Sequence, residues 1–567
     1  MAVSGLCALW YAARFISLEH TSVGGGPPYA RFGLAAPTSA SAAEGLCPQV
    51  DATYPLKHAD LDGTLMALYA DETFQARAFE ALAGAIQIPT ESYDDLKPVG
   101  KDPRWETFGV LQEYLQITFP KVFQTLSFTT VNTYGIVLHW QGSDTSTRPV
   151  LMAGHQDVVP VEPTTVNDWK HPPYSGLFDG EWIWGRGTCD DKSDVIASLH
   201  AIDALIEQGF QPRRTFVWAY GFDEEASGME GAGKLAEYLE ETYGTHGFEM
   251  LLDEGGSYGT PYGEGVIFAT PALSEKGYLD VRVEVTTKGG HSSVPPAHTG
   301  IGMLSAMIVE LEANPLETSL IRGGSPYNYT MCAAAHGPAY PPTVRRLALH
   351  AAETGSDADL ADLEDALLAA FPFYSAVLRT TQAVDLVAGG VKVNALPERV
   401  SAVVNHRIAE HASVAALQAH YVATLAAVAE AFDLTLDAFG TNVSAGTGRG
   451  GHVALSDAWG TALEPSPVTP MGKGAPYEVF AGTVKATIES SDRYEGSSVV
   501  VAPLLTIGNT DTRYYWNLTK HIVRYKHLHN QDAYNGAHTV NEAVRAKGWI
   551  ETIRFYTKFV LNWDEHQ

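Results

Sequence analysis

A predicted β-strand ends in a histidine and an aspartate, a pair that could take part in metal chemistry. The stretch LMAGHQDVVP, residues 151–160, places His155 and Asp157 directly after an apolar run. Because successive side chains of a strand point to opposite faces, positions 155 and 157 lie on the same side. A metal-ligating imidazole with an orienting carboxylate has this arrangement. A surface turn after a core strand would also explain it, so the other motifs must decide.

Three further stretches carry carboxylates at the ends of predicted elements. The stretch GRGTCDDKSD brings Asp190 before a helix, FDEEASG carries Glu224 and Glu225, and LLDEGG carries Asp253. In an open α/β sheet, ligands bind outside the carboxyl ends of the strands, so we expect these side chains to meet there. Each stretch by itself also fits a solvated turn or a helix cap. A cluster of carboxylates needs protons or cations, and with histidine present it predicts a two-metal site.

The elements that must position these residues alternate between strand and helix from about residue 60 to 275. Strands are predicted at PVLMAGH, RTFVWAYGF and FEMLLDEGG. An amphipathic helix is predicted at DVIASLHAIDALIEQGF, and Gly209 ends it. This alternation predicts an α/β fold with a mostly parallel sheet flanked by helices. From about residue 277, YLDVRVEVTTKGG and VKVNALPERVSAVVNHRI alternate strictly, which predicts half-exposed strands of an inserted α+β domain.

This pattern divides the chain into four segments. Thr539 and Glu542 have the spacing of a capping box, so the C-terminal helix is predicted to begin there. The expected segments are an N-terminal tether or degenerate signal or anchor over 1–45, the main domain over 46–276 and 439–567, and the inserted domain over 277–438.

Charge limits the classes of partner. The chain has 37 basic and 66 acidic side chains, a net charge of −29, and no stripe rich in Lys or Arg. Binding to a nucleic-acid backbone or to anionic lipid by charge is therefore not expected.

The N-terminal run, the cysteines and three sequons bear on the compartment. The apolar run VSGLCALWYAARFI has signal-peptide length, but no basic residue precedes it and Arg14 interrupts it, so a signal or membrane anchor is weakly indicated. The four cysteines lack zinc-type spacing, and one bridge, for example Cys47–Cys332, is compatible with their number. Three glycosylation sequons, at Asn328, Asn442 and Asn517, permit a secretory route without showing it.

Seven motifs in order resemble the di-zinc exopeptidase family of aminoacylases, dipeptidases and glutamate carboxypeptidases, and the fungal carboxypeptidase S branch most. They are GHQDVVPV, GRGTCDDKSD, FDEEASG, LLDEGG, GGHSSVPPAHTGIG, GNTDTRYYWNLTKHIVRY and GAHTVNEAV. The resemblance runs from about residue 46 to the C-terminus. It implies two Zn²⁺ ions, with Co²⁺ or Mn²⁺ as alternatives. His155 and Asp253 would bind one ion, Glu225 and His538 the other, and Asp190 would bridge them.

The resemblance also implies roles for residues that do not bind metal. Asp157 would orient the first histidine, and Glu224 would be the general base. In the inserted domain, which resembles the family's lid, His291 would stabilise the oxyanion, and Asn394 and Arg407 would hold the substrate carboxylate.

Further details follow from the same resemblance. Thr510 and Asp511 match a stretch that lines the cleft, and the Asp190–Asp191 peptide is expected to be cis. Many relatives have Glu at the position matched by Asp253, and here Glu254 stands beside it.

The implied activity is metal-dependent hydrolysis of the C-terminal amide bond of short peptides. An N-acyl-amino-acid hydrolase with the same site is the alternative, because both cleave an amide next to a free carboxylate. A non-catalytic relative that binds peptide or metal is the third reading, and Glu224 and His291 argue against it, since a binder needs neither. The family also implies a homodimer that forms through the lid. It further implies a vacuolar or secretory location, although the weak N-terminal signal argues against that location.

Overall fold

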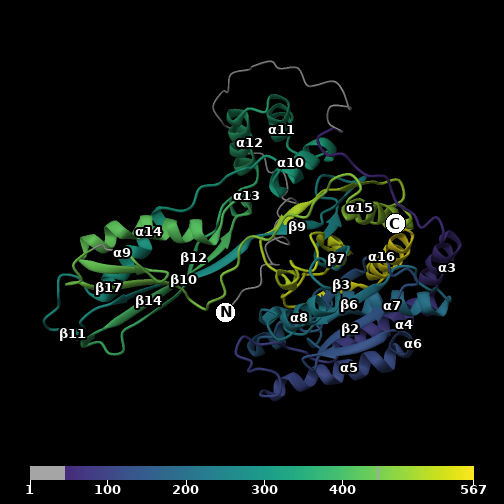
Figure 1. The fold of residues 1–567 in the computed structure, drawn as a ribbon, viewed down its shortest axis with the longest axis horizontal. Helices are drawn as coiled ribbons and strands as arrows, with labels where there is room; N and C mark the ends of the chain where they lie inside the picture. Colours follow the sequence, from purple (N-terminus) through teal and green to yellow (C-terminus); the bar gives the residue numbers. More distant parts are fainter. Residues whose placement is uncertain (1–44, 444–445, 567) are drawn as a thin grey trace. The chain divides into compact units, whose positions relative to one another are not determined.

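The computed structural model describes residues 45–443 and 446–566 and divides the chain into two compact units (Figure 1). The expected tether over 1–45 lies outside the described residues except for its last position. Unit 1 comprises the described chain up to Leu273, Asn328–Ser356, and the chain from Pro467 onward; unit 2 comprises Ser274–Tyr327 and Asp357–Ser466.

Unit 1 is built on a mixed sheet whose central strands are parallel. Along the described chain the order is β1-β2-β6-β3-β7-β20-β9-β19, with β8 and β18 joined at β7. Parallel pairing links β6, β3, β7 and β20, and β1 and β2 add antiparallel strands at one edge. The strands are β1 (Ser127–Val131), β2 (Gly135–Trp140), β3 (Val150–His155), β6 (Phe216–Gly221), β7 (Met250–Gly259), β8 (Val266–Ala269), β9 (Ala272–Glu275), β18 (Ser498–Val501), β19 (Leu504–Thr506) and β20 (Ile522–His529).

Helices cover both faces of this sheet, as the alternating pattern predicts. Every residue of β3 is buried; Leu151 and Ala153 pack in the cluster that contains α8, whereas Val150 and Met152 pack in the cluster that contains α7. A strand buried on both faces must be apolar throughout, which is why VLMAGH reads as a continuous run. The helices of this unit include α3 (Ala59–Ala70), α4 (Glu72–Ile86), α5 (Glu106–Thr118), α6 (Pro120–Thr125), α7 (Lys192–Glu207), α8 (Ala232–Tyr243), α11 (Pro342–Thr354), α15 (Pro476–Glu489) and α16 (Ala546–Glu565).

The predicted start of the C-terminal helix is wrong. Helix α16 begins at Ala546, and Ala543–Arg545 form strand β21, which pairs with β5 (Trp182–Trp184), itself paired with β4 (Leu177–Phe178). Glu542 does not cap the helix, because its carboxylate accepts hydrogen bonds from a distant loop instead. The local capping-box spacing is therefore overruled by a tertiary contact.

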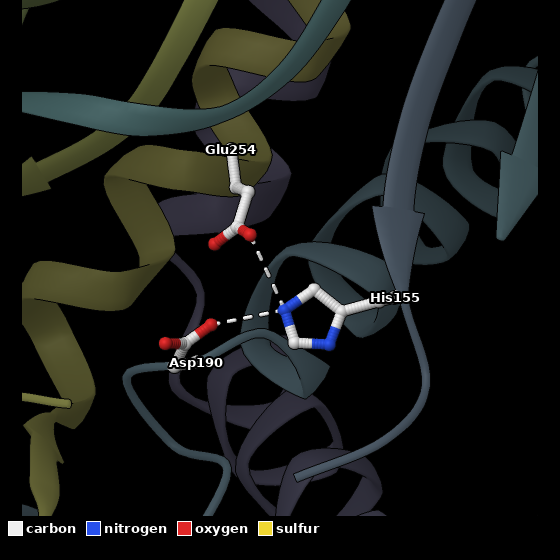
Figure 2. Close-up of side chains that lie close together, drawn as sticks. All are labelled: His155, Asp190 and Glu254. Atoms are coloured by element: carbon white, nitrogen blue, oxygen red, sulfur yellow. Dashed lines mark hydrogen bonds and ion pairs between the residues drawn. The ribbon is translucent and has the colours of Figure 1, made fainter. Parts of the chain in front are cut away.

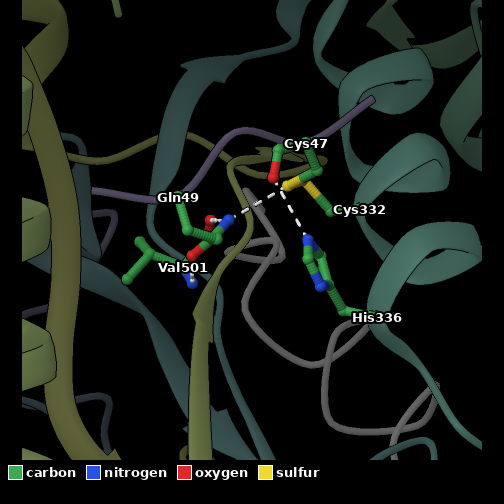
Figure 3. The surroundings of a disulfide bond; sticks show 5 residues. All are labelled: Cys47, Gln49, Cys332, His336 and Val501. Atoms are coloured by element: carbon green, nitrogen blue, oxygen red, sulfur yellow. Dashed lines mark hydrogen bonds between the residues drawn. A yellow bond between two sulfur atoms is a disulfide. The ribbon is translucent and has the colours of Figure 1, made fainter. Parts of the chain in front are cut away.

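A disulfide joins Cys47 to Cys332 in helix α10 (Ser325–His336), both in unit 1 (Figure 3). Beside it, the side chain of Gln49 exchanges hydrogen bonds with the backbone of Val501, at 2.8 and 3.1 Å. Nε2 of His336 lies 3.1 Å from the carbonyl oxygen of Cys47. The start of the described chain is thus held covalently to α10 and by hydrogen bonds to β18.

Unit 2 is a separate sheet with its own core, in keeping with an inserted α+β domain. Its bounds differ from the expected 277–438, because it extends to Ser466 and excludes Asn328–Ser356. Its strand order along the described chain is β12-β14-β10-β17-β15-β16, and only β15 and β17 pair in parallel. Burial alternates along β10 and β14 except at Asp280 and Val403, which are also buried, and this agrees broadly with the sequence alternation. The elements are β10 (Gly277–Thr286), β12 (Ala383–Gly389), β14 (Arg399–Ile408), β15 (Leu434–Ala438), β16 (Thr441–Asn442), β17 (Gly451–Asp457), α9 (Gly300–Ala313), α12 (Asp357–Ala370), α13 (Tyr374–Leu378) and α14 (Val414–Ala431).

Helices α9 and α14 pack on this sheet. Of the described helices, only α14 is long and apolar enough to cross a membrane by composition. Its residues Leu417, Tyr421 and Leu425 are fully buried in the core of unit 2. Spaced four apart, they form the stripe by which a helix of a globular domain packs on a sheet.

Candidate metal centre

The carboxyl ends of three parallel strands bring the predicted residues together. His155 ends β3 and pairs with Gly221, the last residue of β6. The short 3₁₀ helix η3 (Glu224–Ala226) follows β6 after two residues, and β7 carries Asp253 and Glu254. Parallel strands end at the same edge of a sheet, so local sequence order is converted into one cluster.

Within the described residues, three groups of side chains have donor atoms within 4.8 Å of one another. The groups are His155–Asp190–Glu254, shown in Figure 2, then Asp190–Glu225–His538, and His155–Glu224–Glu225. Nε2 of His155 lies 3.0 Å from Oδ1 of Asp190 and 3.4 Å from Oε1 of Glu254. Mixed imidazole and carboxylate donors that converge in this way fit a divalent ion such as zinc.

Asp190 faces a histidine with each of its oxygens. Oδ1 lies 3.0 Å from Nε2 of His155, and Oδ2 lies 3.0 Å from Nε2 of His538, which is also 2.8 Å from Oε1 of Glu225. A carboxylate placed between two donor groups has the arrangement needed to bridge two ions. The peptide between Asp190 and Asp191 is cis, which confirms that expectation.

The structure brings Glu254, rather than the expected Asp253, to the donor group of His155. Oδ1 of Asp253 accepts a hydrogen bond from the backbone N–H of Glu254 at 3.0 Å, and the Asp253 side chain belongs to none of the three groups. The cause is a break in the pairing of β7 with β20: Arg524 pairs with Asp253, but Tyr525 pairs with Gly256. Glu254 therefore lies in a bulge, and bulges redirect side chains near active sites.

Asp157 connects the strand β3 to the helix η3. Its carboxylate accepts hydrogen bonds from the backbone N–H groups of Glu224 and Glu225, at 3.1 and 3.0 Å, and from Oγ of Ser92 at 2.6 Å. Nδ1 of His155 lies 3.2 Å from Oδ1 of Asp157, so the opposite nitrogen, Nε2, faces the metal-donor carboxylates. The expected contact with His155 is present, and the hold on the Glu224–Glu225 turn was not anticipated.

The electrostatics of the cluster call for cations. Burial, followed by the charges of Glu254 and Glu225, raises the pKa of Glu224 well above its ordinary value. Burial opposes ionisation of Asp190 as well, but hydrogen bonds from the two histidines outweigh it and hold the pKa of that carboxyl well below its usual range. Burial disfavours protonation of His538, yet Glu225 and Asp190 raise its pKa to about 11. Divalent ions would supply the positive charge that the histidines otherwise provide.

A lysine that sequence reasoning missed balances two other carboxylates. Nζ of Lys526, on β20, donates to Oδ1 of Asp191 at 3.0 Å and lies 3.5 Å from Oδ2 of Asp194. All three side chains are buried. The strand IVRYKHLH also carries Arg524 and two histidines, so the lysine did not stand out in the sequence, although buried lysines are rare unless paired.

Thr510 lies in unit 1 outside the three donor groups. Its Oγ1 caps the 3₁₀ helix η5 (Asp511–Tyr514) by accepting from the N–H of Thr512 at 3.3 Å. The residues of this turn contact the loop that follows Glu224 and Glu225. The Tyr514 hydroxyl donates to the carbonyl oxygen of Ser227 at 2.8 Å, and the Arg513 guanidinium donates to the same oxygen. The turn at Asp511–Tyr514 therefore holds the carbonyl group of Ser227, two residues after Glu225.

The remaining predicted residues lie in unit 2. Strands β11 (Gly290–His291) and β13 (Ala395–Leu396) pair so that His291 faces Ala395, which brings His291 beside Asn394. Nδ1 of His291 accepts from the N–H of Ser293 at 3.0 Å, so a neutral ring carries its proton on Nε2. Arg407, on β14, lies over the ring of Tyr278 at 5.1 Å.

The chain is similar in sequence and in fold to known proteins. A family model for peptidase family M20/M25/M40 matches residues 151–562. The chain is 37% identical over 503 residues to carboxypeptidase S of Saccharomyces cerevisiae, which covers 88% of this chain and 86% of that protein. It is 31% identical over 502 residues to the N-fatty-acyl-amino acid synthase/hydrolase PM20D1 of Mus musculus, covering 86% and 88%. The structure of human carnosine dipeptidase 1 matches with a TM-score of 0.56 at 14% identity, covering 88% and 99%.

Proposed function

This chain belongs to peptidase family M20/M25/M40 and is a carboxypeptidase-like metallopeptidase, and we propose that it removes the C-terminal residue of short peptides by metal-assisted hydrolysis. The observation that carries the proposal is the position of Asp190 between two donor groups, with a histidine at each of its oxygens. The similarity to carboxypeptidase S supports a substrate with a free carboxylate.

We propose that two zinc ions occupy the site, with Co²⁺ or Mn²⁺ as substitutes. His155 and Glu254 would hold one ion, Glu225 and His538 the other, and Asp190 would bridge them. Two such ions, when bound, lower the pKa of a water molecule and polarise the scissile carbonyl.

Glu224 is the proposed general base. It is buried, and no hydrogen-bond partner of its Oε2 is found among the described residues, so this oxygen is available to the attacking water. Its backbone is fixed by Asp157, which accepts its N–H. Glu224 would take a proton from the water and pass it to the leaving amine.

The residues of unit 2 are proposed to recognise the substrate. His291, whose Nδ1 is already occupied by Ser293, would donate from Nε2 to the developing oxyanion. Arg407 and Asn394 would bind the α-carboxylate, for which a guanidinium fork is suited. Thr510, whose Oγ1 caps the 3₁₀ helix η5, is proposed to line the substrate cleft.

An N-acyl-amino-acid hydrolase is the second candidate, favoured by the similarity to the N-fatty-acyl-amino acid synthase/hydrolase of Mus musculus. The two functions are separated by measuring hydrolysis of an N-blocked Gly-Leu dipeptide and of a fatty-acyl-leucine, each with and without a zinc chelator. Chelator-sensitive cleavage of the dipeptide supports the carboxypeptidase, and a strong preference for the fatty-acyl substrate supports the alternative. If metal-loaded protein cleaves neither, both proposals fail.

The similarity to carboxypeptidase S and the Cys47–Cys332 bridge support a proposed secretory or vacuolar location, since disulfides persist in oxidising compartments. A homodimer through unit 2 is likewise proposed. Strand β12 lies at the edge of its sheet and exposes Leu386 and Val387. Cell fractionation and light scattering test these two proposals.

A further inference from the structure

Two segments far apart in sequence meet next to the candidate metal centre. Strands β5 and β21 pair antiparallel, with Trp184 opposite Ala543. The loop after β5 covers residues 185–189 and leads into Asp190, and the turn before β21 covers residues 539–542 and follows His538. Asp190 follows the 185–189 loop, and His538 precedes the 539–542 turn. The pairing of β5 with β21 joins these two segments, and the side chains of Asp190 and His538 lie 3.0 Å apart.

Glu542 connects these segments through both its side chain and its backbone. Its Oε1 accepts from the N–H groups of Gly187 and Cys189, at 2.9 and 2.8 Å, and its Oε2 accepts from Nη1 of Arg186 at 2.5 Å. Its carbonyl oxygen accepts from the N–H of Gly185 at 2.9 Å. One fully buried residue thus accepts four hydrogen bonds from the loop that leads into Asp190.

Both segments contain residues with positive backbone φ values, two of which are not glycine. Gly187 adopts a φ of +94°, and His538 and Asn541 adopt φ values of +61° and +65°. Residues other than glycine adopt this region rarely and need support from their surroundings. Arg186 provides a second link, since the same Nη1 lies 3.3 Å from the carbonyl oxygen of Thr539, beside His538.

These contacts need two acceptor oxygens at position 542. Every partner of the Glu542 side chain is a donor, so both of its oxygens must accept. An amide at this position would point an NH₂ group either at the guanidinium or at the two backbone N–H groups. The contacts depend on charge and acceptor geometry rather than on filling space alone.

We propose that Glu542 is a positioning residue that sets the separation of Asp190 from His538 and thereby the affinity of the site for its second metal ion. The inference rests on the proposed two-metal site. Residues that orient metal ligands typically change metal affinity by about 10–100-fold when they are replaced. A purely structural buried ion pair would change stability and leave metal affinity alone.

Glu551 offers a matched control. It is a buried carboxylate of unit 1 that also pairs with an arginine, Arg554 at 2.9 Å, and accepts from Oγ of Ser491 at 3.0 Å. It contacts neither the 185–189 loop nor the 539–542 turn in any described hydrogen bond. Replacing Glu551 therefore removes a similar buried ion pair that lies outside the two segments beside the metal centre.

The test is a titration of metal-free protein with Co²⁺, followed by visible absorption and by competition with a chelating dye. We expect Glu542→Gln to weaken binding of the second Co²⁺ equivalent by about 10–100-fold and to alter its absorption band. We expect Glu551→Gln to lower the melting temperature while both Co²⁺ equivalents bind as in the wild type. Wild-type Co²⁺ affinity and absorption in a folded Glu542→Gln protein would overturn the inference.

Arg186→Gln keeps the inference testable if Glu542→Gln does not fold. It retains the two backbone N–H contacts of Glu542 and should cause a smaller loss of Co²⁺ affinity in the same direction; an unchanged affinity overturns the inference. A failure of the proposed function gives a different result. If wild-type protein binds two Co²⁺ ions but cleaves no substrate, the proposed peptidase activity is wrong, and the Co²⁺ affinities of the variants can still be compared.

Discussion

Oδ1 of Asp190 lies 3.0 Å from Nε2 of His155, at the end of the central strand β3. Its other oxygen lies as close to His538, which comes from the far end of the chain. A single carboxylate thus joins the two halves of the candidate metal centre.

Glu224→Gln should retain both metal ions and lose activity by about 10²–10⁴-fold, because the amide cannot accept the proton of the attacking water. Metal content is measured on the same protein preparation as kcat. Near-normal turnover with full metal occupancy would remove Glu224 from the mechanism.

Replacing the two neighbouring acids of β7 should separate their roles. Glu254→Gln should lower the affinity for one metal ion, because Glu254 belongs to the donor group of His155. Asp253→Asn should keep two ions, since its carboxylate accepts from the N–H of Glu254 and lies outside the donor groups. Metal stoichiometry after dialysis measures both. If Asp253→Asn loses a metal ion and Glu254→Gln keeps both, Asp253 is the ligand and Glu254 is not.

Arg407→Ala should raise KM by about 10–100-fold for peptides with a free C-terminal carboxylate, the size expected for losing a charge-assisted bidentate contact. The amidated form of the same peptide should be affected little. Arg399→Ala supplies the control, because Arg399 lies on the same strand, is exposed and pairs with Glu284. Equal losses on both substrates would contradict the assignment.

Removal of the Cys47–Cys332 bridge should destabilise unit 1. The bridge spans a sequence separation of 285 residues, and such cross-links typically stabilise by about 2–4 kcal/mol. The Cys47→Ser/Cys332→Ser protein should therefore unfold at a lower temperature. A reductant should lower the melting temperature of the wild type toward that of the variant and leave the variant unchanged. A wild-type protein insensitive to the reductant would argue against the bridge.

His406 should make unit 2 less stable in acid. Burial lowers its pKa from 6.5 to about 4, against a smaller opposing effect of the Thr381 carbonyl, and its ring also contacts the hydroxyl of Tyr421. Between those two pH values the unfolded state binds a proton that the folded state excludes. Stability is therefore full above pH 6.5 and falls as the pH drops toward 4, by about 3 kcal/mol in total.

The measurement is the melting temperature from pH 7.5 to pH 4.5 for the wild type and for His406→Gln, which can still donate and accept. The variant should lose less stability on acidification than the wild type. Parallel curves would show that His406 does not contribute.

Much of the fold could be predicted from short stretches of chain. The continuous apolar run before His155 and the strict alternation from residue 277 distinguish a strand buried on both faces from a half-exposed one. The resemblance to the exopeptidase family implied His155, Asp190, Glu225 and His538 as metal ligands, and the structure groups their donor atoms. The strand patterns, in contrast, were read from the residues alone. These features depend on side-chain period and on residue type, and both are local properties.

Other features were decided only by contacts between distant segments. A one-residue difference along a strand reverses the direction of a side chain, so the choice between Asp253 and Glu254 depends on the bulge that β7 forms against β20. Glu542 has the spacing of a helix cap, yet its carboxylate is taken by the loop before Asp190.

The sequence by itself therefore determined which elements form and which residue types gather at the strand ends, because periodicity and residue chemistry are set by near neighbours. Only the tertiary structure decided which of two adjacent acids faces His155, and which loop Glu542 holds. Those outcomes follow from strand pairing and buried hydrogen bonds between segments hundreds of residues apart, for which no local pattern carries a signal.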